Sequence, residues 1–372
     1  MLKRRKGGHY MFLAIRELFY FKLRYMMVAL IIFLLSFLVL FVSGLAQGLA
    51  DDNASSIINM GEEAEYFVID EEAELQLTRS LITDTDQQTV DNVVEEAQIL
   101  GIHQGTIQDE TETITDVAKF FVDHNSALFP EVVEGERPTE QGEVLADLSI
   151  QEEGYSVGDE FQEDTTEEIF SISGFTNDQR YSHTPVLYMT EDDWLELSGR
   201  DELLASALVL PDTGDDVVNT LNSEMDEAEV VTIQDSLSGI PGYSEEQGSL
   251  WMMIIFLFII SAFVVAAFFY VITIQKLTQF GILKALGAKL SGLANTILIQ
   301  VGLVTVVSAG AGIGATFLAA TLLPADMPFM LPMNLVAILA GIFIFVAILG
   351  SLLSLYKVKK VDALEAIGGM EA

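Results

Sequence analysis

The chain contains no cysteine and few basic residues. Without cysteine it cannot form disulfides, Cys-ligated zinc sites or a catalytic thiolate. Its 18 Lys and Arg residues stand against 55 Asp and Glu residues, a formal net charge of −37. Such a surface repels phosphate backbones, so we expect no nucleic-acid partner. Yet 51% of the 372 residues are hydrophobic, too many for a disordered acidic chain. Acidic and hydrophobic residues must therefore concentrate in different segments.

Motifs that carry catalytic chemistry are also missing from the sequence. The four histidines form no HExxH pattern, and no GxSxG pentapeptide occurs. Residues 281–289 contain glycines and lysines in the wrong spacing for a phosphate-binding loop, and no Ser or Thr follows Lys289. We therefore expect no catalytic residue, no metal site and no permanently bound cofactor, which argues against an enzyme.

Four segments without formal charge dominate the two ends of the chain. A helix needs about 20 apolar residues to cross a bilayer, and each of these segments is long enough. We predict membrane spans over residues 26–50, 249–275, 291–323 and 332–356. No Asp, Glu, Lys, Arg or His lies in the four span cores, which argues against an ion-coupled transporter. The sequence thus predicts an α-helical membrane protein with four transmembrane helices.

The charge distribution predicts how the chain is oriented. Segment 51–248 holds nearly all of the acidic residues, whereas most basic residues lie in 1–25, 276–290 and 357–372. Basic residues in short loops stay on the cytoplasmic side. We therefore expect a cell-membrane protein with both termini and loop 276–290 in the cytoplasm, and with 51–248 and the turn 324–331 outside. A cleaved signal peptide is the alternative interpretation of the first span, which is longer than the usual 7–15 apolar residues.

The long polar segment predicts a large extracellular α+β domain inserted between the first and second spans. Short β-like runs occur at 66–69, 169–172, 185–189, 207–210 and 230–233. They alternate with helix-like stretches, one over 89–100 and one that Thr190 can cap.

Before the first span, apolar residues recur at helical spacing while basic residues take other positions. The apolar residues are Phe12, Ile15, Phe19 and Leu23, and the basic ones are Arg16, Lys22 and Arg24. This pattern predicts an amphipathic helix on the inner leaflet or, alternatively, a cytoplasmic extension of the first span.

Glycines four residues apart predict close helix packing inside the membrane. The pairs are Gly44 with Gly48 and Gly310 with Gly314, and small residues at this spacing let helix backbones approach each other. Because glycine is common in membrane helices, chance remains the alternative.

The loop 276–290 is a short amphipathic stretch between two spans. Phe280, Leu283 and Leu286 can form one apolar face, which is typical of a docking site for a partner. A helix lying on the lipid surface is the alternative.

At this loop the sequence resembles the MacB/FtsX-type ABC permeases. Residues 268–287 resemble their second span and coupling loop, and the order of one span, a large outer domain and three spans is the same. Within this superfamily the chain is most similar to the HrtB type, permeases of haemin-transport (haem efflux) systems of Gram-positive bacteria. The segments that carry this similarity are 41–49, 275–287, 341–350 and 361–369, with fainter matches at 154–159 and 181–183.

The resemblance implies a homodimeric permease that works with two copies of a separate ABC ATPase and lies in membrane lipid. It assigns the ATPase contact to Phe280, Gly281, Ile282, Lys284 and Gly287. ATP-driven closure of the ATPase would move the spans and the outer domains, a mechanotransmission-type mechanism. Haem would be the transported substrate. A permease for antimicrobial peptides, lipids or lipoproteins, an FtsX-like signal transmitter and a receptor without an ATPase are the alternatives.

Residues that could hold haem lie near the outer ends of the first two spans. Haem iron accepts His, Met or Tyr as axial ligands. Tyr243, Met252 and Met253 cluster there beside Trp251 and Phe256, and an interfacial aromatic belt facing lipid is the alternative interpretation. Tyr181 and His183 in the outer domain are lesser candidates.

Overall fold

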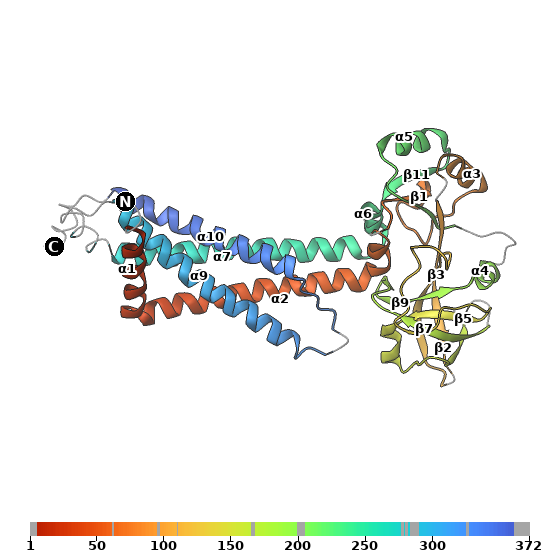
Figure 1. Ribbon diagram of the computed structural model, residues 1–372, viewed down its shortest axis with the longest axis horizontal. Coiled ribbons are helices and arrows are strands. Elements are labelled where there is room, and N and C mark those ends of the chain that lie inside the picture. The colour runs from red at the N-terminus through yellow and green to blue at the C-terminus, as the bar shows by residue number, and fades with distance from the viewer. Residues whose placement is uncertain are drawn as a thin grey trace. The chain divides into compact units, whose positions relative to one another are not determined.

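The computed structural model describes residues 6–61, 63–94, 97–109, 111–164, 168–198, 205–276, 279, 282, 290–324 and 327–360. The chain divides into two compact units. The helical unit comprises Met1–Gln47 and Ser249–Ala372, and the sheet unit comprises Gly48–Gly248. Figure 1 shows the elements of both.

In the described residues, the helical unit contains one short helix and four long apolar ones. They are α1 (Lys6–Tyr20), α2 (Lys22–Met60), α7 (Tyr243–Gln275), α9 (Leu290–Ala320) and α10 (Met333–Lys360). The last four contain windows long and apolar enough to cross a membrane, so the prediction of four spans is confirmed. Their shared core includes Ile32 of α2, Phe269 of α7, Val301 of α9 and Phe343 of α10.

Two of these helices are longer than their uncharged runs. α2 continues to Met60 and α7 begins at Tyr243, so each is one uninterrupted helix that contributes residues to both units. The extra turns of α2 are stabilised by packing, because Ala54 and Ile57 are fully buried in the core of the sheet unit. The charges at 51 and 52 therefore mark the end of the apolar run and not the end of the helix.

The N-terminal segment is a helix of its own. α1 ends at Tyr20, and a turn at Phe21 separates it from α2 (Figure 1). Ala14 is buried and α1 packs along α9, whereas Phe12 and Phe19 are exposed in the single chain. The exposed apolar positions are those that the sequence assigned to the inner leaflet.

Among the described residues, the sheet unit contains eleven strands, seven helical segments, the C-terminal end of α2 and the first residues of α7. The strands are β1 (Tyr66–Asp70), β2 (Gln98–Gln108), β3 (Ile114–Phe121), β4 (Glu134–Gly135), β5 (Glu143–Asp147), β6 (Glu160–Glu163), β7 (Ile169–Thr176), β8 (Arg180–Tyr181), β9 (Thr184–Met189), β10 (Ala207–Leu210) and β11 (Ala228–Thr232). The helical segments are η1 (Glu71–Ala73), α3 (Asp84–Val93), η2 (Leu148–Glu153), α4 (Glu191–Ser198), α5 (Asp215–Glu224), α6 (Ile233–Ser236) and η3 (Leu237–Gly239), of which η3 directly continues α6.

One half of the sheet unit is an antiparallel sheet in the order β11-β1-β10-β2. Its strands are covered on both faces. Val68 of β1 packs with residues of α3 and α5, including Val90 and Leu221. Phe67, on the opposite face of the same strand, packs with Ile57 of α2. The period-2 alternation of a strand thus places successive side chains in two cores.

The other half is a closed ring of six strands. β2 pairs with β3, β3 with β9, β9 with β5, β5 with β7, β7 with β6, and β6 again with β2. Val117, Phe161 and Leu187 are among the residues that form its core. The long strand β2 belongs to both halves, since its first residues pair with β10 and its later ones with β3.

The five strands expected from sequence are present as β1, β7, β9, β10 and β11. Thr190 caps α4 as expected, because its Oγ1 accepts a hydrogen bond from the Asp193 amide at 3.3 Å. The helix expected over 89–100 is wrong in its bounds. α3 ends at Val93, and Leu100 pairs with Ala207 of β10, so strand pairing decides the conformation of residues 98–100.

Candidate functional site

A buried polar cluster lies in the helical unit at the point where α7 ends. Its centre is Lys276, of which 2% is exposed. The Lys276 ammonium donates hydrogen bonds to Glu17 Oε2 at 2.7 Å, to the Tyr25 hydroxyl at 2.9 Å and to Gln300 Oε1 at 3.2 Å. We call these four residues the Lys276 network.

The network satisfies its own polar groups. The Tyr25 hydroxyl donates to Gln300 Oε1 at 3.0 Å, and Gln300 Nε2 donates to Glu17. The Lys276 ammonium also lies 5.6 Å from the Tyr25 ring centroid, within range of a cation–π interaction. A buried ammonium needs such compensation, because an unpaired buried charge is strongly destabilising.

Four separate helical elements supply the network. Glu17 comes from α1, Tyr25 from α2 and Gln300 from α9, while Lys276 directly follows α7. Lys276 is also the first residue of loop 276–290. The hydrogen bonds of Lys276 therefore connect the start of this loop to three other helices.

The loop itself contains the residues assigned to the ATPase contact. Among them the structure describes Ile282, whose side chain is 50% exposed. Phe280, Gly281, Lys284 and Gly287 lie outside the described residues. Their assignment stays a prediction.

Tyr181 is not placed where haem could reach it. It is completely buried in the sheet unit, and its ring packs edge-on against Phe120 at 5.5 Å between centroids. Burial raises the pKa of the Tyr181 hydroxyl and so opposes the phenolate form that binds iron. Tyr181 is therefore inaccessible to haem in this structure, and its role as a haem ligand stays a prediction.

His183 is partly exposed, but both of its ring nitrogens already have neighbours. Nδ1 lies 2.6 Å from Asp52 Oδ2, and Nε2 lies 3.1 Å from Asn53 Nδ2 and 3.6 Å from Glu246 Oε2. Asp52 also pairs with Arg180 Nε at 2.6 Å. The histidine thus ties the β8–β9 turn to α2 and α7, which is a structural role. Among the described residues, no group of three or more His, Asp or Glu is arranged to hold a metal ion.

The methionine candidates are accessible in the single chain. Met252 and Met253 on α7 are 57% and 43% exposed, in the same stretch as the exposed Trp251 and Phe256. Tyr243, the first residue of α7, is only partly buried and packs against the core of the sheet unit. These three residues thus divide between the two units.

Within the single chain, the glycines differ in how closely other groups approach them. A Cβ placed on Gly44 would lie 2.4 Å from the Phe329 ring, and Gly44 accepts a backbone hydrogen bond from Met330. Nothing lies within 4 Å of a Cβ at Gly310 or Gly314, whereas one at Gly312 would lie 2.2 Å from Ser36 Oγ of α2. The close approach of α9 to α2 is therefore at Gly312. Gly48 lies within α2.

Sequence reasoning missed the Lys276 network. Its members are separated by up to 283 positions, from Glu17 to Gln300, so no local pattern joins them. One signal was present: Glu17 is the only acidic residue before the first span. A single carboxylate in a basic segment is a reason to look for a specific cationic partner.

Comparison with known proteins assigns the chain to a family. Residues 251–363 match the FtsX-like permease C-terminal family. A protein of Staphylococcus haemolyticus named as a hemin transport system permease protein, HrtB, is 34% identical over 367 residues, which covers 96% of this chain and 99% of that protein. A protein of the same name from Staphylococcus epidermidis is 30% identical over 96% of this chain and 99% of its own.

Two solved structures are similar to part of the chain. The extracellular domain of the ABC-type transporter YknZ from Gram-positive bacteria is 14% identical, with a TM-score of 0.33, and covers 45% of this chain and 98% of its own. The periplasmic region of MacB from Actinobacillus actinomycetemcomitans is 11% identical, with a TM-score of 0.35, and covers 46% of this chain and 90% of its own. These scores are too low to add to the assignment. The whole-length similarity is sufficient, and the chain belongs to the HrtB family of FtsX-like ABC permeases.

Proposed function

We propose that this chain is the permease subunit of an ABC transporter that exports haem from the cell membrane and is driven by a separate ATPase subunit. The observation that carries the proposal is the similarity over 96% of the chain to proteins named as hemin transport permeases. Haem is then the transported substrate and not a resident cofactor.

ATP hydrolysis is assigned to a partner because the sequence has no phosphate-binding motif. Two ATPase copies would seat on loop 276–290 of a permease homodimer, through Phe280, Gly281, Ile282, Lys284 and Gly287. Basic residues near the spans support an orientation with both termini and this loop in the cytoplasm. The four apolar helices lie in membrane lipid, and the whole-length Staphylococcus relatives support a Gram-positive source.

The Lys276 network and the long helices support a mechanotransmission-type mechanism. Movement of loop 276–290 acts directly on Lys276 and, through its hydrogen bonds, on α1, α2 and α9. α2 and α7 carry the displacement onward, because each is one continuous helix with residues in both units. ATP would shift a two-state equilibrium by binding one state of the assembly more tightly.

Met252 and Met253 are the haem-ligand candidates that this proposal keeps, since both thioethers are accessible on α7. Tyr243 can take part only if its packing against the sheet unit opens.

The proposal is tested by growth of a deletion strain on haemin. We expect the wild-type gene and Ile114→Asp to restore haemin tolerance, and Phe280→Asp to fail although it is expressed in the membrane. Ile114→Asp is the matched control, because it adds the same charge at a 65% exposed apolar residue of the sheet unit. Full tolerance with Phe280→Asp would refute the coupling role. Sensitivity of the deletion strain to membrane-active peptides but not to haemin would refute the substrate and favour the peptide alternative.

A further inference from the structure

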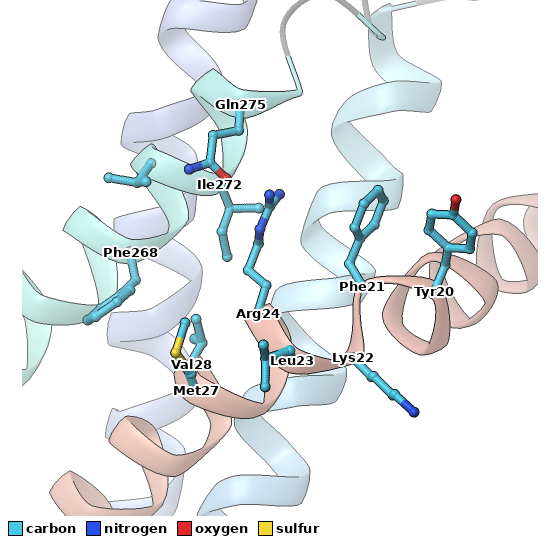
Figure 2. A pocket seen from close by; sticks show the side chains of 11 residues that line it. Tyr20, Phe21, Lys22, Leu23, Arg24, Met27, Val28, Phe268, Ile272 and Gln275 are labelled. Carbon is cyan, nitrogen blue, oxygen red and sulfur yellow. The ribbon is translucent and has the colours of Figure 1, made fainter.

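A groove lies in the helical unit between the α1–α2 turn and the last two turns of α7. It has a volume of about 550 Å³. Figure 2 shows its lining side chains, which converge from α2 and α7. Its apolar walls are formed by Leu23, Met27, Val28, Phe268, Val271 and Ile272.

The groove is open along one side and closed at its base. Val28 and Ile272 at the base are 2% and 6% exposed. Leu23, Met27 and Val271 at the rim are between 49% and 66% exposed. An apolar rim of this kind on a membrane helix faces lipid, so the groove can admit an acyl chain from the side.

One cation stands at the polar end of the groove. The Arg24 guanidinium lies 5.3 Å from the Phe21 ring centroid and projects toward the end of α7, near Gln275 (Figure 2). Within the part of the chain that the structure describes, no carboxylate pairs with Arg24. Lys22 also lines the groove, but its side chain points away from Arg24 (Figure 2), so Arg24 is the cation on the side of Gln275.

We infer that this groove binds a phospholipid with an anionic headgroup. The acyl chain would lie against the apolar walls, and the phosphate would accept hydrogen bonds from the Arg24 guanidinium and from Gln275. Basic pockets between membrane helices on the cytoplasmic side are suited to anionic headgroups, and the cytoplasmic placement rests on the orientation given under the proposed function. Haem carries two neighbouring carboxylates, whereas Arg24 is one cation beside Gln275 at the polar end of the groove.

The site has a consequence for coupling. Gln275 is the residue before Lys276, and Phe21 follows α1. A bound lipid would therefore hold the α1–α2 turn against the end of α7, beside the start of loop 276–290, and the lipid composition of the membrane would affect how that loop moves.

The test is native mass spectrometry of the full chain, purified in detergent and titrated with phosphatidylglycerol or phosphatidylcholine. We expect wild type to retain phosphatidylglycerol in preference to phosphatidylcholine. Arg24→Gln should weaken phosphatidylglycerol retention by about five-fold, the factor expected when one interfacial Arg is lost. Arg16→Gln is the matched control, because Arg16 is an exposed arginine of α1 outside the groove.

A second variant keeps the charge and fills the groove. Val271→Trp should reduce retention of both lipids while Arg24 is intact, which guards against a folding defect in Arg24→Gln. Equal retention by wild type, Arg24→Gln and Val271→Trp would overturn the inference. Displacement of the lipid by equimolar haemin would also overturn it, by identifying a porphyrin site. Since the readout is lipid mass, the inference can fail or succeed independently of haem export.

Discussion

Replacing Lys276 by methionine should destabilise the helical unit. The change keeps the length of the side chain and removes a cation that is 2% exposed and that contacts three polar side chains. Loss of one partner of a fully buried pair costs about 3–5 kcal/mol. The Glu17 side chain is 24% exposed, so water can partly solvate the carboxylate that is left behind. We therefore expect a loss of about 2–3 kcal/mol in the free energy of unfolding.

The double variant separates an ion pair from simple packing. In Lys276→Met with Glu17→Met, the orphaned carboxylate is gone as well, so the double variant should be more stable than the sum of the two single changes predicts, by about 1–2 kcal/mol. Lys22→Met is the matched control, since Lys22 is an exposed lysine of α2 and should have little effect.

The measurement is unfolding of the purified full chain in one detergent, with wild type, the two single variants, the double variant and Lys22→Met compared side by side. ATPase activity of the assembled transporter gives the functional readout, and Lys276→Met should uncouple it from haem more than Lys22→Met does. Lys276→Met with the stability of Lys22→Met would refute the reasoning. Additive effects of Lys276→Met and Glu17→Met would do so as well.

Three further changes test the packing and titration of the fold. Lys119→Met removes the cation that pairs with the buried Glu163, so it should lower the free energy of unfolding by about 3–5 kcal/mol. The double variant Lys119→Met with Glu163→Leu should recover most of this loss in chemical denaturation. No recovery would contradict the pairing. Burial and the Lys119 ammonium lower the pKa of His103 below its ordinary 6.5. As the pH drops below 6.5, the unfolded chain therefore binds this proton before the folded chain does, and the free energy of unfolding should fall. His103→Gln should weaken that pH dependence in melting curves at pH 7 and 5, and an unchanged dependence would refute the assignment. Gly312→Ala should destabilise the helical unit by about 1–3 kcal/mol, because the added methyl group would contact α2. Gly314→Ala should be tolerated in the same detergent assay, because its added methyl group would meet open space. Equal melting temperatures of the two variants would contradict the close approach.

Membrane spans were predictable because a bilayer imposes a simple requirement. Each uncharged run had to be a helix, and the number and order of the spans follow from that. The helix ends were not predictable from the same signal. α2 continues past Asp51 and Asp52 because Ala54, Ile57 and Met60 pack into the sheet unit, and tertiary packing of this kind leaves no mark in hydropathy.

The sheet unit was predictable as α+β but not in its pairing. β2 and β3 contain Gly105 and Lys119, which interrupt an apolar strand pattern. In the structure the Lys119 side chain occupies the space beside Gly105, since a Cβ on Gly105 would lie 2.7 Å from Lys119 Nζ. Pairings such as β2 with β6, or β3 with β9, join residues far apart in the chain, and local propensity carries no information about them.

The candidate site divides in the same way. Loop 276–290 could be identified from the sequence, because apolar residues at helical spacing between two predicted spans indicate contact with a partner or with lipid. The Lys276 network could not, because Tyr25, Gln300 and Lys276 meet only when α2, α7 and α9 are packed. The burial of Tyr181 was not predictable for a related reason, since its packing against Phe120 depends on β3 and β8 coming together.

The ring of six strands reduces the number of strand edges that the sheet unit exposes to other chains. A strand edge with free amides and carbonyls is a template for aggregation, and closure of the ring leaves little of it. In the part of the chain that the structure describes, the pairing order ends at β4, with two residues, and at β11, with five. On β11, Glu229 adds a charge that disfavours the approach of another strand. The described strands therefore leave few and short edges with which a strand of another copy could pair.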